Sequence, residues 1–331
     1  MASLFDIHLS PKAMSQVLAL GRRLEELGYH ALYLADSHLN NMDPFQVVAV
    51  AAQSLERLRF GTAVTNMVYR DPTVLASSSV TANQMSQGRF ELGLGTGDGT
   101  VHRMGLSPTR MVDFEEGVRV IRDLAGGRLV PYPPGPIGLR GAGDFPVPVY
   151  LSVEGPRGLA IAGRVADGVI LGSGFDVRVT DWARTQIADS AVAAGRRPED
   201  IRLTAAGIVC VDADGDRARA RVRSRLANRA HHNFRYSLGT VPQEHRPDVQ
   251  RFMDAFDVRK PIEERVPVEL VPDYLVHRFA IAGTPDECAA RIRELEQLGI
   301  GRFLLTPPGG HFDATVEAWA EQVMPRVTVP A

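Results

Sequence analysis

Five short polar segments of this chain carry residue types that acid–base chemistry and phosphate binding require. Each one comes directly after an apolar run. Acidic and histidine side chains can give or take protons, and backbone N–H groups can hold an anion. In a barrel of parallel strands, reacting groups gather where the strands end and the loops begin. The five segments are Asp36-Ser37-His38, Thr65-Asn66, Gly95-Thr96-Gly97-Asp98, Glu154-Gly155-Pro156 and Gly172-Ser173-Gly174.

Glycines alternate along the third of these segments, at Gly93, Gly95, Gly97 and Gly99. Alternating glycine removes side chains from one face, so a flat ligand could lie against bare backbone. A tight turn that needs a positive φ explains the same pattern. The spacing lacks the third glycine of the dinucleotide fingerprint, and no Gly-Lys-Ser/Thr follows to make a phosphate-binding Walker loop.

Glu154-Gly155-Pro156 is predicted to open a helix directly after an apolar run. Free N–H groups at a helix start attract phosphate. An ordinary strand-to-helix turn with proline at the first helical position fits the same residues. A phosphate here requires the side chain of Glu154 to point away.

Apolar runs and helical patterns alternate along most of the chain, which indicates βαβ units and a parallel sheet. Eight strands are expected, at residues 4–9, 30–35, 58–64, 90–94, 149–153, 169–171, 201–211 and 303–306. Helices are expected at 44–55, 72–88, 156–166, 177–194, 218–230, 284–298 and 316–323, and another ends at Gly28. Because each strand is followed by a helix, we predict one α/β domain over residues 1–331, a (β/α)8 TIM barrel.

Two segments interrupt this alternation, and we expect both to be insertions at the carboxyl-terminal face of the strands. Residues 129–148 are rich in proline and glycine and are predicted to form a loop. Residues 231–275 are polar, then acidic and rich in proline. A long segment without strands in a compact domain is usually a lid or a binding loop.

Composition excludes several classes of function. The formal net charge is −2 and no run of Lys or Arg forms a basic patch, so nucleic acid is not an expected partner. Cys210 and Cys288 fit neither a metal site nor a disulfide framework, and His231-His232 lacks a third ligand. No signal peptide and no run of about 20 apolar residues is visible. We therefore expect a cytoplasmic protein with no metal and no membrane contact.

Several segments, in this order, resemble the bacterial luciferase-like superfamily. They are Leu27–Asp36, Leu58–Asn66, Arg70–Pro72, Gly88–Gly97, Ala162–Ile170 and Ala282–Glu287. Members bind either flavin mononucleotide (FMN) or the deazaflavin coenzyme F420. Within the superfamily the chain most resembles F420-dependent methylenetetrahydromethanopterin reductases and deazaflavin-dependent sugar-phosphate dehydrogenases. The resemblance implies a homodimer and a small-molecule substrate.

The resemblance also implies roles for individual residues. It predicts a non-proline cis peptide between Ala63 and Val64, against which the deazaflavin ring rests. Asp36 and Asn66 are expected at the ring, and Gly95, Thr96, Gly97 and Asp98 beside the ring and substrate. Ser152, Val153, Glu154 and Gly155 would offer amides to the cofactor phosphate, and Gly172, Ser173 and Gly174 would close around its tail. The candidate catalytic residues are Asp98, as proton donor or substrate-orienting acid, Asp36 and His38.

Two departures from the family pattern bear on the substrate. Relatives often have histidine directly after the strand-two aspartate, whereas Ser37 stands there and His38 follows it. The lysines that hold a sugar phosphate are missing, since the chain has only Lys12 and Lys260.

We therefore expect an oxidoreductase that moves hydride between F420 and a small organic substrate. An FMN-dependent monooxygenase using reduced flavin and O2 is the first alternative. A barrel that binds flavin without turnover is the second, and a metal-dependent hydrolase is a distant third.

Overall fold

The computed structural model describes residues 3–235, 237–260 and 264–327. Parallel strands alternate with helices along the chain, as expected for a (β/α)8 barrel, and the predicted fold class is confirmed. The described residues divide into two compact units. One comprises Phe5–Ile170 and Thr185–Leu203, and the other comprises the remaining described residues. No helix among the described residues is long and apolar enough to cross a membrane.

The first unit holds the strands that follow one another from the amino terminus. They are β1 (Leu4–Leu9), β2 (Ala31–Leu34), β3 (Arg59–Thr62), β4 (Thr65–Asn66), β5 (Phe90–Gly95), β6 (Val149–Ser152) and β7 (Gly168–Leu171). All of their pairings are parallel, so their carboxyl ends meet at one edge of the sheet. There Asn66 pairs with Gly95, and Leu94 pairs with Leu151. This register brings the predicted polar segments after β2, β4, β5 and β6 to neighbouring positions.

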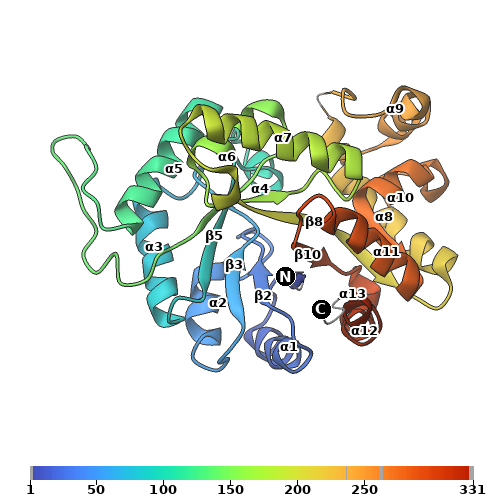
Figure 1. Ribbon diagram of the computed structural model, residues 1–331, viewed down its shortest axis with the longest axis horizontal. Coiled ribbons are helices and arrows are strands. Elements are labelled where there is room, and N and C mark those ends of the chain that lie inside the picture. Colours follow the sequence, from blue (N-terminus) through green and yellow to red (C-terminus); the bar gives the residue numbers. More distant parts are fainter. Residues whose placement is uncertain (1–2, 236, 261–263, 328–331) are drawn as a thin grey trace. The chain divides into compact units, whose positions relative to one another are not determined.

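Helices cover the outer side of these strands (Figure 1). They are α1 (Met14–Glu26), α2 (Pro44–Ala51), α3 (Pro72–Met85), α4 (Gly99–Arg103), α5 (Met111–Ala125) and α6 (Pro156–Val165). α7 (Val177–Ala193) has residues in both units. Local signals begin one of these helices and end another, as predicted. Asp71 accepts the Thr73 N–H at the start of α3, where Pro72 is the first residue, and Gly28 follows α1 with φ +80°. α4 and α5 were not predicted from the sequence.

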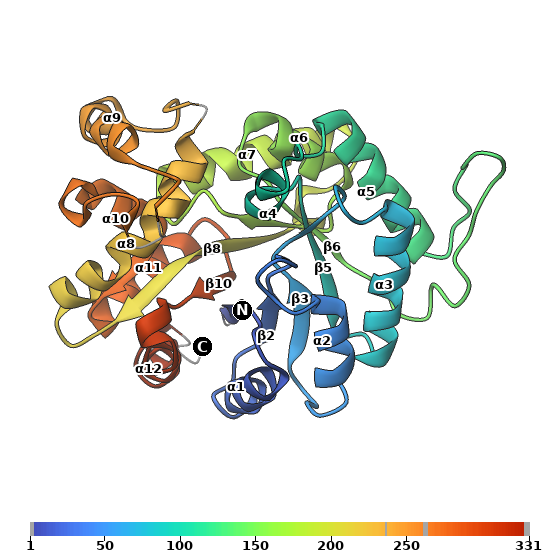
Figure 2. The ribbon, with the colours of Figure 1, turned by 180° about the vertical axis from the view of Figure 1, so that it is seen from behind.

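The predicted third strand, residues 58–64, is broken into two. β3 ends at Thr62, and β4 begins at Thr65 and pairs only with β5. The Ala63–Val64 peptide between them is cis. The loop expected at 129–148 lies between α5 and β6 and contains one isolated bridge, between Val130 and Ile137. Both views show this loop projecting away from α3 and α5 (Figures 1 and 2).

The second unit contains β8 (Arg202–Val211), β9 (Ala280–Gly283) and β10 (Arg302–Thr306). β8 pairs with β10 over residues 205–208 and with β9 over 208–211, and β9 was missed in the sequence. Its helices are α8 (Gly215–Phe234), α9 (Arg246–Ala255), α10 (Asp273–Phe279), α11 (Pro285–Glu296), α12 (Phe312–Ala318) and α13 (Met324–Val327). The predicted capping box of Thr284 and Glu287 opens α11.

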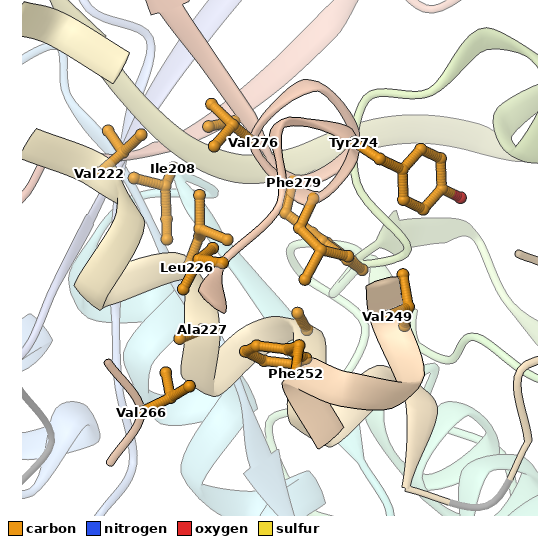
Figure 3. Packing of buried hydrophobic residues seen from close by; sticks show 14 of the residues in the cluster. Ile208, Val222, Leu226, Ala227, Val249, Phe252, Val266, Tyr274, Val276 and Phe279 are labelled. Atoms are coloured by element: carbon orange, nitrogen blue, oxygen red, sulfur yellow. The ribbon is translucent and has the colours of Figure 1, made fainter. Parts of the chain in front are cut away.

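The segment expected to act as a lid contains helices that share one buried cluster with β8 and β9 (Figure 3). α8 extends beyond the predicted residues 218–230 and includes His231 and His232. Val249 and Phe252 of α9 pack in one buried cluster with Leu226 of α8 and Phe279 of α10. Burial of such side chains stabilises this segment against the rest of its own unit. Its role as a lid stays a prediction.

Candidate functional site

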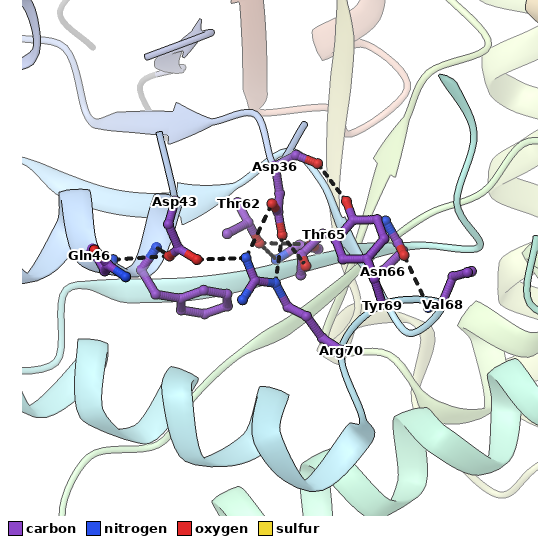
Figure 4. A network of polar contacts seen from close by, with 11 residues as sticks. Asp36, Asp43, Gln46, Thr62, Thr65, Asn66, Val68, Tyr69 and Arg70 are labelled. Atoms are coloured by element: carbon purple, nitrogen blue, oxygen red, sulfur yellow. Dashed lines mark hydrogen bonds and ion pairs between the residues drawn. The ribbon is translucent and has the colours of Figure 1, made fainter. Parts of the chain in front are cut away.

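Asp36, which lies just beyond the end of β2, is at the centre of a buried polar network (Figure 4). Its side chain is fully buried. The carboxylate accepts hydrogen bonds from Thr65 Oγ1 at 2.7 Å, from Arg70 Nε at 3.0 Å and from Arg70 Nη2 at 3.3 Å. Both carboxylate oxygens therefore bind groups of the protein itself, and they tie the end of β2 to the segment after β4.

Arg70 carries the network to the start of the next helix. Its Nη2 also donates to Asp43 at 2.8 Å, and Asp43 accepts the N–H groups of Phe45 and Gln46 at the start of α2. The guanidinium lies 5.2 Å from the centre of the Phe45 ring. Burial opposes the charge of Arg70, but its hydrogen bonds to Asp36 and Asp43 outweigh that effect and raise its pKa above the ordinary value. This cation stays charged at any pH the protein meets.

Tyr69 and Asn66 complete the network. The Tyr69 hydroxyl donates to the backbone oxygen of Asp36 at 2.7 Å, and Asn66 Oδ1 accepts the Val68 N–H at 3.0 Å. Burial, together with the charge of Asp36, raises the pKa of Tyr69 to about 12, so the phenol stays protonated and remains a donor. His38 is exposed, and its ring packs edge-on against Tyr69 with 4.6 Å between ring centres.

The predicted cis peptide between Ala63 and Val64 is confirmed. The Ala63 carbonyl lies 3.2 Å from Nε2 of His8, a partly buried residue near the end of β1. His8 was not among the residues predicted from the sequence. A histidine one residue before the carboxyl end of the first strand was the signal that could have identified it.

Close packing of the backbone, rather than a bare face for a flat ligand, explains the glycines at positions 93 and 95. A Cβ on Gly93 would lie 1.9 Å from the Thr62 carbonyl oxygen, and one on Gly95 would lie 2.8 Å from Cγ2 of Val64. The space beside both glycines is therefore filled by the broken strand rather than left bare for a ligand. At Gly97 the φ of +100° supports the alternative explanation, a turn that glycine favours.

Asp98 lies at the start of α4 and is partly exposed. Its Oδ1 lies 3.6 Å from Nε2 of His102, with side-chain exposures of 42% and 44%. Arg103 donates to Asn40 Oδ1 at 3.1 Å and so ties α4 to the loop after β2. The Asp98 carboxylate thus has a titratable partner and access to solvent, which a group that exchanges protons needs.

Ser152, Val153, Glu154 and Gly155 lead from β6 into α6, as predicted. Gly155 is the N-cap residue, no side chain caps the helix, and its first turn has no acidic residue. A Cβ on Gly155 would meet no atom within 4 Å. The first turn of α6 therefore has no side-chain cap, and the space beside Gly155 is open. The uncapped N–H groups of this turn fit a phosphate group.

Gly172, Ser173 and Gly174 follow β7 and belong to the second unit. All three are buried. Arg229 Nε donates to the Gly172 carbonyl at 2.8 Å, and Arg278 Nε donates to the Ser173 carbonyl at 3.3 Å. The structure thus brings together the predicted residues after β2, β4, β5 and β6 within one unit, and it places this turn in the other.

Comparison with known proteins identifies the family of this chain and several relatives that it resembles. The model of the family described as luciferase-like monooxygenase matches residues 3–302. The chain is 31% identical over 299 residues to a 5,10-methylenetetrahydromethanopterin reductase of Methanolobus tindarius, covering 86% of this chain and 88% of that protein. It is 28% identical over 335 residues to an F420-dependent glucose-6-phosphate dehydrogenase of Microbacterium testaceum, covering 95% and 93%.

Among solved structures, the chain is similar to a coenzyme F420 dependent tetrahydromethanopterin reductase from Methanopyrus kandleri. The TM-score is 0.85, the identity is 23%, and the match covers 99% of this chain and 100% of that one. At 23% identity, this similarity supports the fold alone.

Proposed function

Because this chain belongs to the luciferase-like monooxygenase family, we propose that it is an F420-dependent oxidoreductase that transfers hydride to or from a small organic substrate. The observation that carries the proposal is its similarity, over nearly its whole length, to a dehydrogenase named for F420. The reductase relative is consistent with the same class of reaction.

The residues at the strand ends fit such a cofactor. The uncapped start of α6 offers N–H donors beside the open space at Gly155, as a phosphate requires. When bound, F420 supplies the ring carbon that accepts or gives up hydride, and the protein supplies binding, orientation and electrostatics.

The protein's own groups divide the remaining work. Asp98 gives or takes, at its carboxylate, the proton that accompanies hydride transfer. His102, 3.6 Å away, is placed to exchange that proton with solvent. Asp36 and Arg70 act as positioning residues, because their polar atoms bind one another and hold the segments after β2 and β4 together.

Cofactor titration tests the first part of this proposal. Purified protein is titrated with F420 and, separately, with FMN, and binding is followed by quenching of cofactor fluorescence. We expect F420 to bind with a dissociation constant at least tenfold below that of FMN. Tight binding of FMN with none of F420 would favour the flavin-dependent monooxygenase instead.

Replacing Asp98 by asparagine tests the catalytic role. Loss of a positioned acid–base group reduces rates by about 100-fold or more. We expect kcat to fall by that factor, on any alcohol or carbonyl compound that bleaches or restores the F420 absorbance, while the dissociation constant of F420 stays within twofold. Asp113→Asn, an exposed change on α5, is the matched control. Equal rates in both variants would remove Asp98 from the mechanism, and binding without turnover of any substrate would favour a non-catalytic protein.

A further inference from the structure

A pocket of about 270 Å³ lies in the second unit and shares no residue with the candidate site. Its wall comes from the end of β8 and the residues after it, from α8, and from the helical segment after β10. Apolar parts of the wall are Val211, Ala314 and Ala318. Sites for drug-sized ligands usually exceed about 300 Å³, so this pocket fits a smaller molecule.

Arg221 of α8 brings a cation to the pocket, and Asp212 holds it in place. Nη1 of Arg221 donates to Asp212 Oδ2 at 2.6 Å. The same carboxylate accepts hydrogen bonds from Arg217 Nε at 3.0 Å, from Arg217 Nη2, and from the Asp214 N–H at 3.0 Å. The bonds from Arg217 are the main cause that lowers the pKa of Asp212, so this carboxylate stays ionised. One carboxylate therefore serves two arginines, and Arg221 receives the smaller share.

The other edge of the Arg221 guanidinium has no oxygen partner. Among the described residues, neither Nε nor Nη2 donates to an oxygen atom. The guanidinium also contacts the buried thiol of Cys210, a weak acceptor that burial keeps neutral by raising its pKa. Nε and Nη2 form a planar fork that matches the two oxygens of a carboxylate. The side chain of Arg221 is 28% exposed, which leaves this fork accessible.

Two neutral side chains of the pocket are available for a second polar group. Gln322 and His311 are both exposed, and their side chains form no hydrogen bond within the part of the chain that the structure describes. An amide and an imidazole can each bind a hydroxyl or a carbonyl group. The pocket thus combines one cationic fork, two neutral polar groups and a short apolar wall, the mixture typical of small-molecule sites.

We propose that this pocket binds a small carboxylic acid that carries a second polar group, such as a hydroxy acid. The carboxylate pairs with Nε and Nη2 of Arg221. The second polar group binds Gln322 or His311, and the carbon chain lies against Ala314 and Ala318. The proposal is independent of the proposed function, because neither F420 nor hydride transfer takes part in it.

The first experiment uses the wild-type protein without cofactor. Isothermal titration calorimetry at constant ionic strength measures the binding of lactate, of its uncharged amide lactamide, and of propanoate, which lacks the hydroxyl. We expect lactate to bind at least tenfold more tightly than lactamide, because a charged acceptor strengthens both hydrogen bonds of the fork. We also expect lactate to bind more tightly than propanoate. Absence of saturable binding, or equal affinities for lactate and lactamide, would overturn the proposal.

Variants of Arg221 place the bound acid in this pocket. Arg221→Met removes the fork and should lower lactate affinity at least tenfold. Arg221→Lys keeps the charge but loses the planar fork, so its affinity should lie between those of Arg221→Met and the wild type. Arg225→Met, an exposed change on the same helix, is the matched control. Equal lactate affinities in Arg221→Met and Arg225→Met would refute the role of the fork.

Ala318→Leu tests the cavity without changing any charge. The larger side chain occupies the pocket, so lactate binding should be lost although Arg221 and Asp212 are unchanged. This variant also covers the case in which Arg221→Met fails to fold because Asp212 has lost a partner, and thermal unfolding checks that each variant is folded. Wild-type lactate affinity in Ala318→Leu would place the acid elsewhere and contradict the proposal.

Discussion

Replacing Arg70 by methionine should destabilise the protein strongly, because it leaves a buried charge without its main partner. The Asp36 side chain is fully buried, and in the variant only the Thr65 hydroxyl would still donate to it. Methionine fills a similar volume and keeps apolar contact with Phe45. The loss therefore reports the ion pair rather than a cavity.

The magnitude follows from burial on the two sides of the pair. Removing one partner of a fully buried ion pair costs about 3–5 kcal/mol. Arg70 is 17% exposed, so water can partly replace it, and we expect a loss of about 3 kcal/mol. Asp36→Asn should cost less, about 1–2 kcal/mol, because Arg70 keeps its second partner, Asp43. The double variant should lose less than the sum of the two, since the residues are in direct contact.

Thermal unfolding followed by circular dichroism measures these losses. Each kcal/mol corresponds to about 2 °C or more in a domain of this size, so Arg70→Met should melt about 6 °C lower. Arg110→Met, which breaks the exposed pair with Asp113, should melt close to the wild type. If Arg70→Met melted with Arg110→Met, or if the single losses were additive, Asp36 and Arg70 would not act as a unit.

Two further predictions concern stability. The Arg164 guanidinium lowers the pKa of Glu115 from 4.5 to about 2, so this ion pair stabilises the fold above pH 4.5 and is lost as the pH falls toward 2. Glu115→Gln should cost about 2 kcal/mol at pH 7 and much less at pH 2, measured by urea unfolding at both pH values; an equal cost at both would contradict the assignment. Gly93→Ala should cost about 3 kcal/mol or more because its Cβ would meet the Thr62 backbone, whereas Gly99→Ala has open space and should be neutral or slightly stabilising by thermal unfolding. Equal melting temperatures would show that the strand can move aside.

Local patterns were enough to predict most of the barrel. β1 has the predicted residues 4–9, and β5, β6 and β8 lie within one or two residues of expectation. These strands are apolar runs bounded by turn residues, so their ends depend on neighbours in the sequence. The missed β9 has only four residues, and it is a strand because β8 extends beyond β10 to pair with it. Such a strand depends on a partner about 70 residues away, which periodicity does not report.

The candidate site, like the fold, could be predicted from the sequence only in part. Sequence reasoning located Asp36 and Asn66 at the strand ends but assigned their polar atoms to a ligand. In the structure Asp36 binds Arg70, which is 34 positions away, and Asn66 accepts the Val68 N–H. A position at a strand end therefore predicts where a side chain lies in the barrel. Which groups the side chain then binds depends on distant donors that fold against it.

Whether a polar group is already bonded within the protein decides whether it is expected to bind a ligand. Side chains bound on all sides, such as Asp36, hold the geometry, whereas exposed groups such as Asp98 and His102 remain able to exchange protons. The backbone divides similarly, because the first turn of α6 has no side-chain cap beside the open space at Gly155, while arginines hold the carbonyls of Gly172 and Ser173. A ligand at the strand ends should therefore be held mainly by main-chain N–H groups. Substitutions of the buried carboxylate should then weaken binding only as far as they move that main chain.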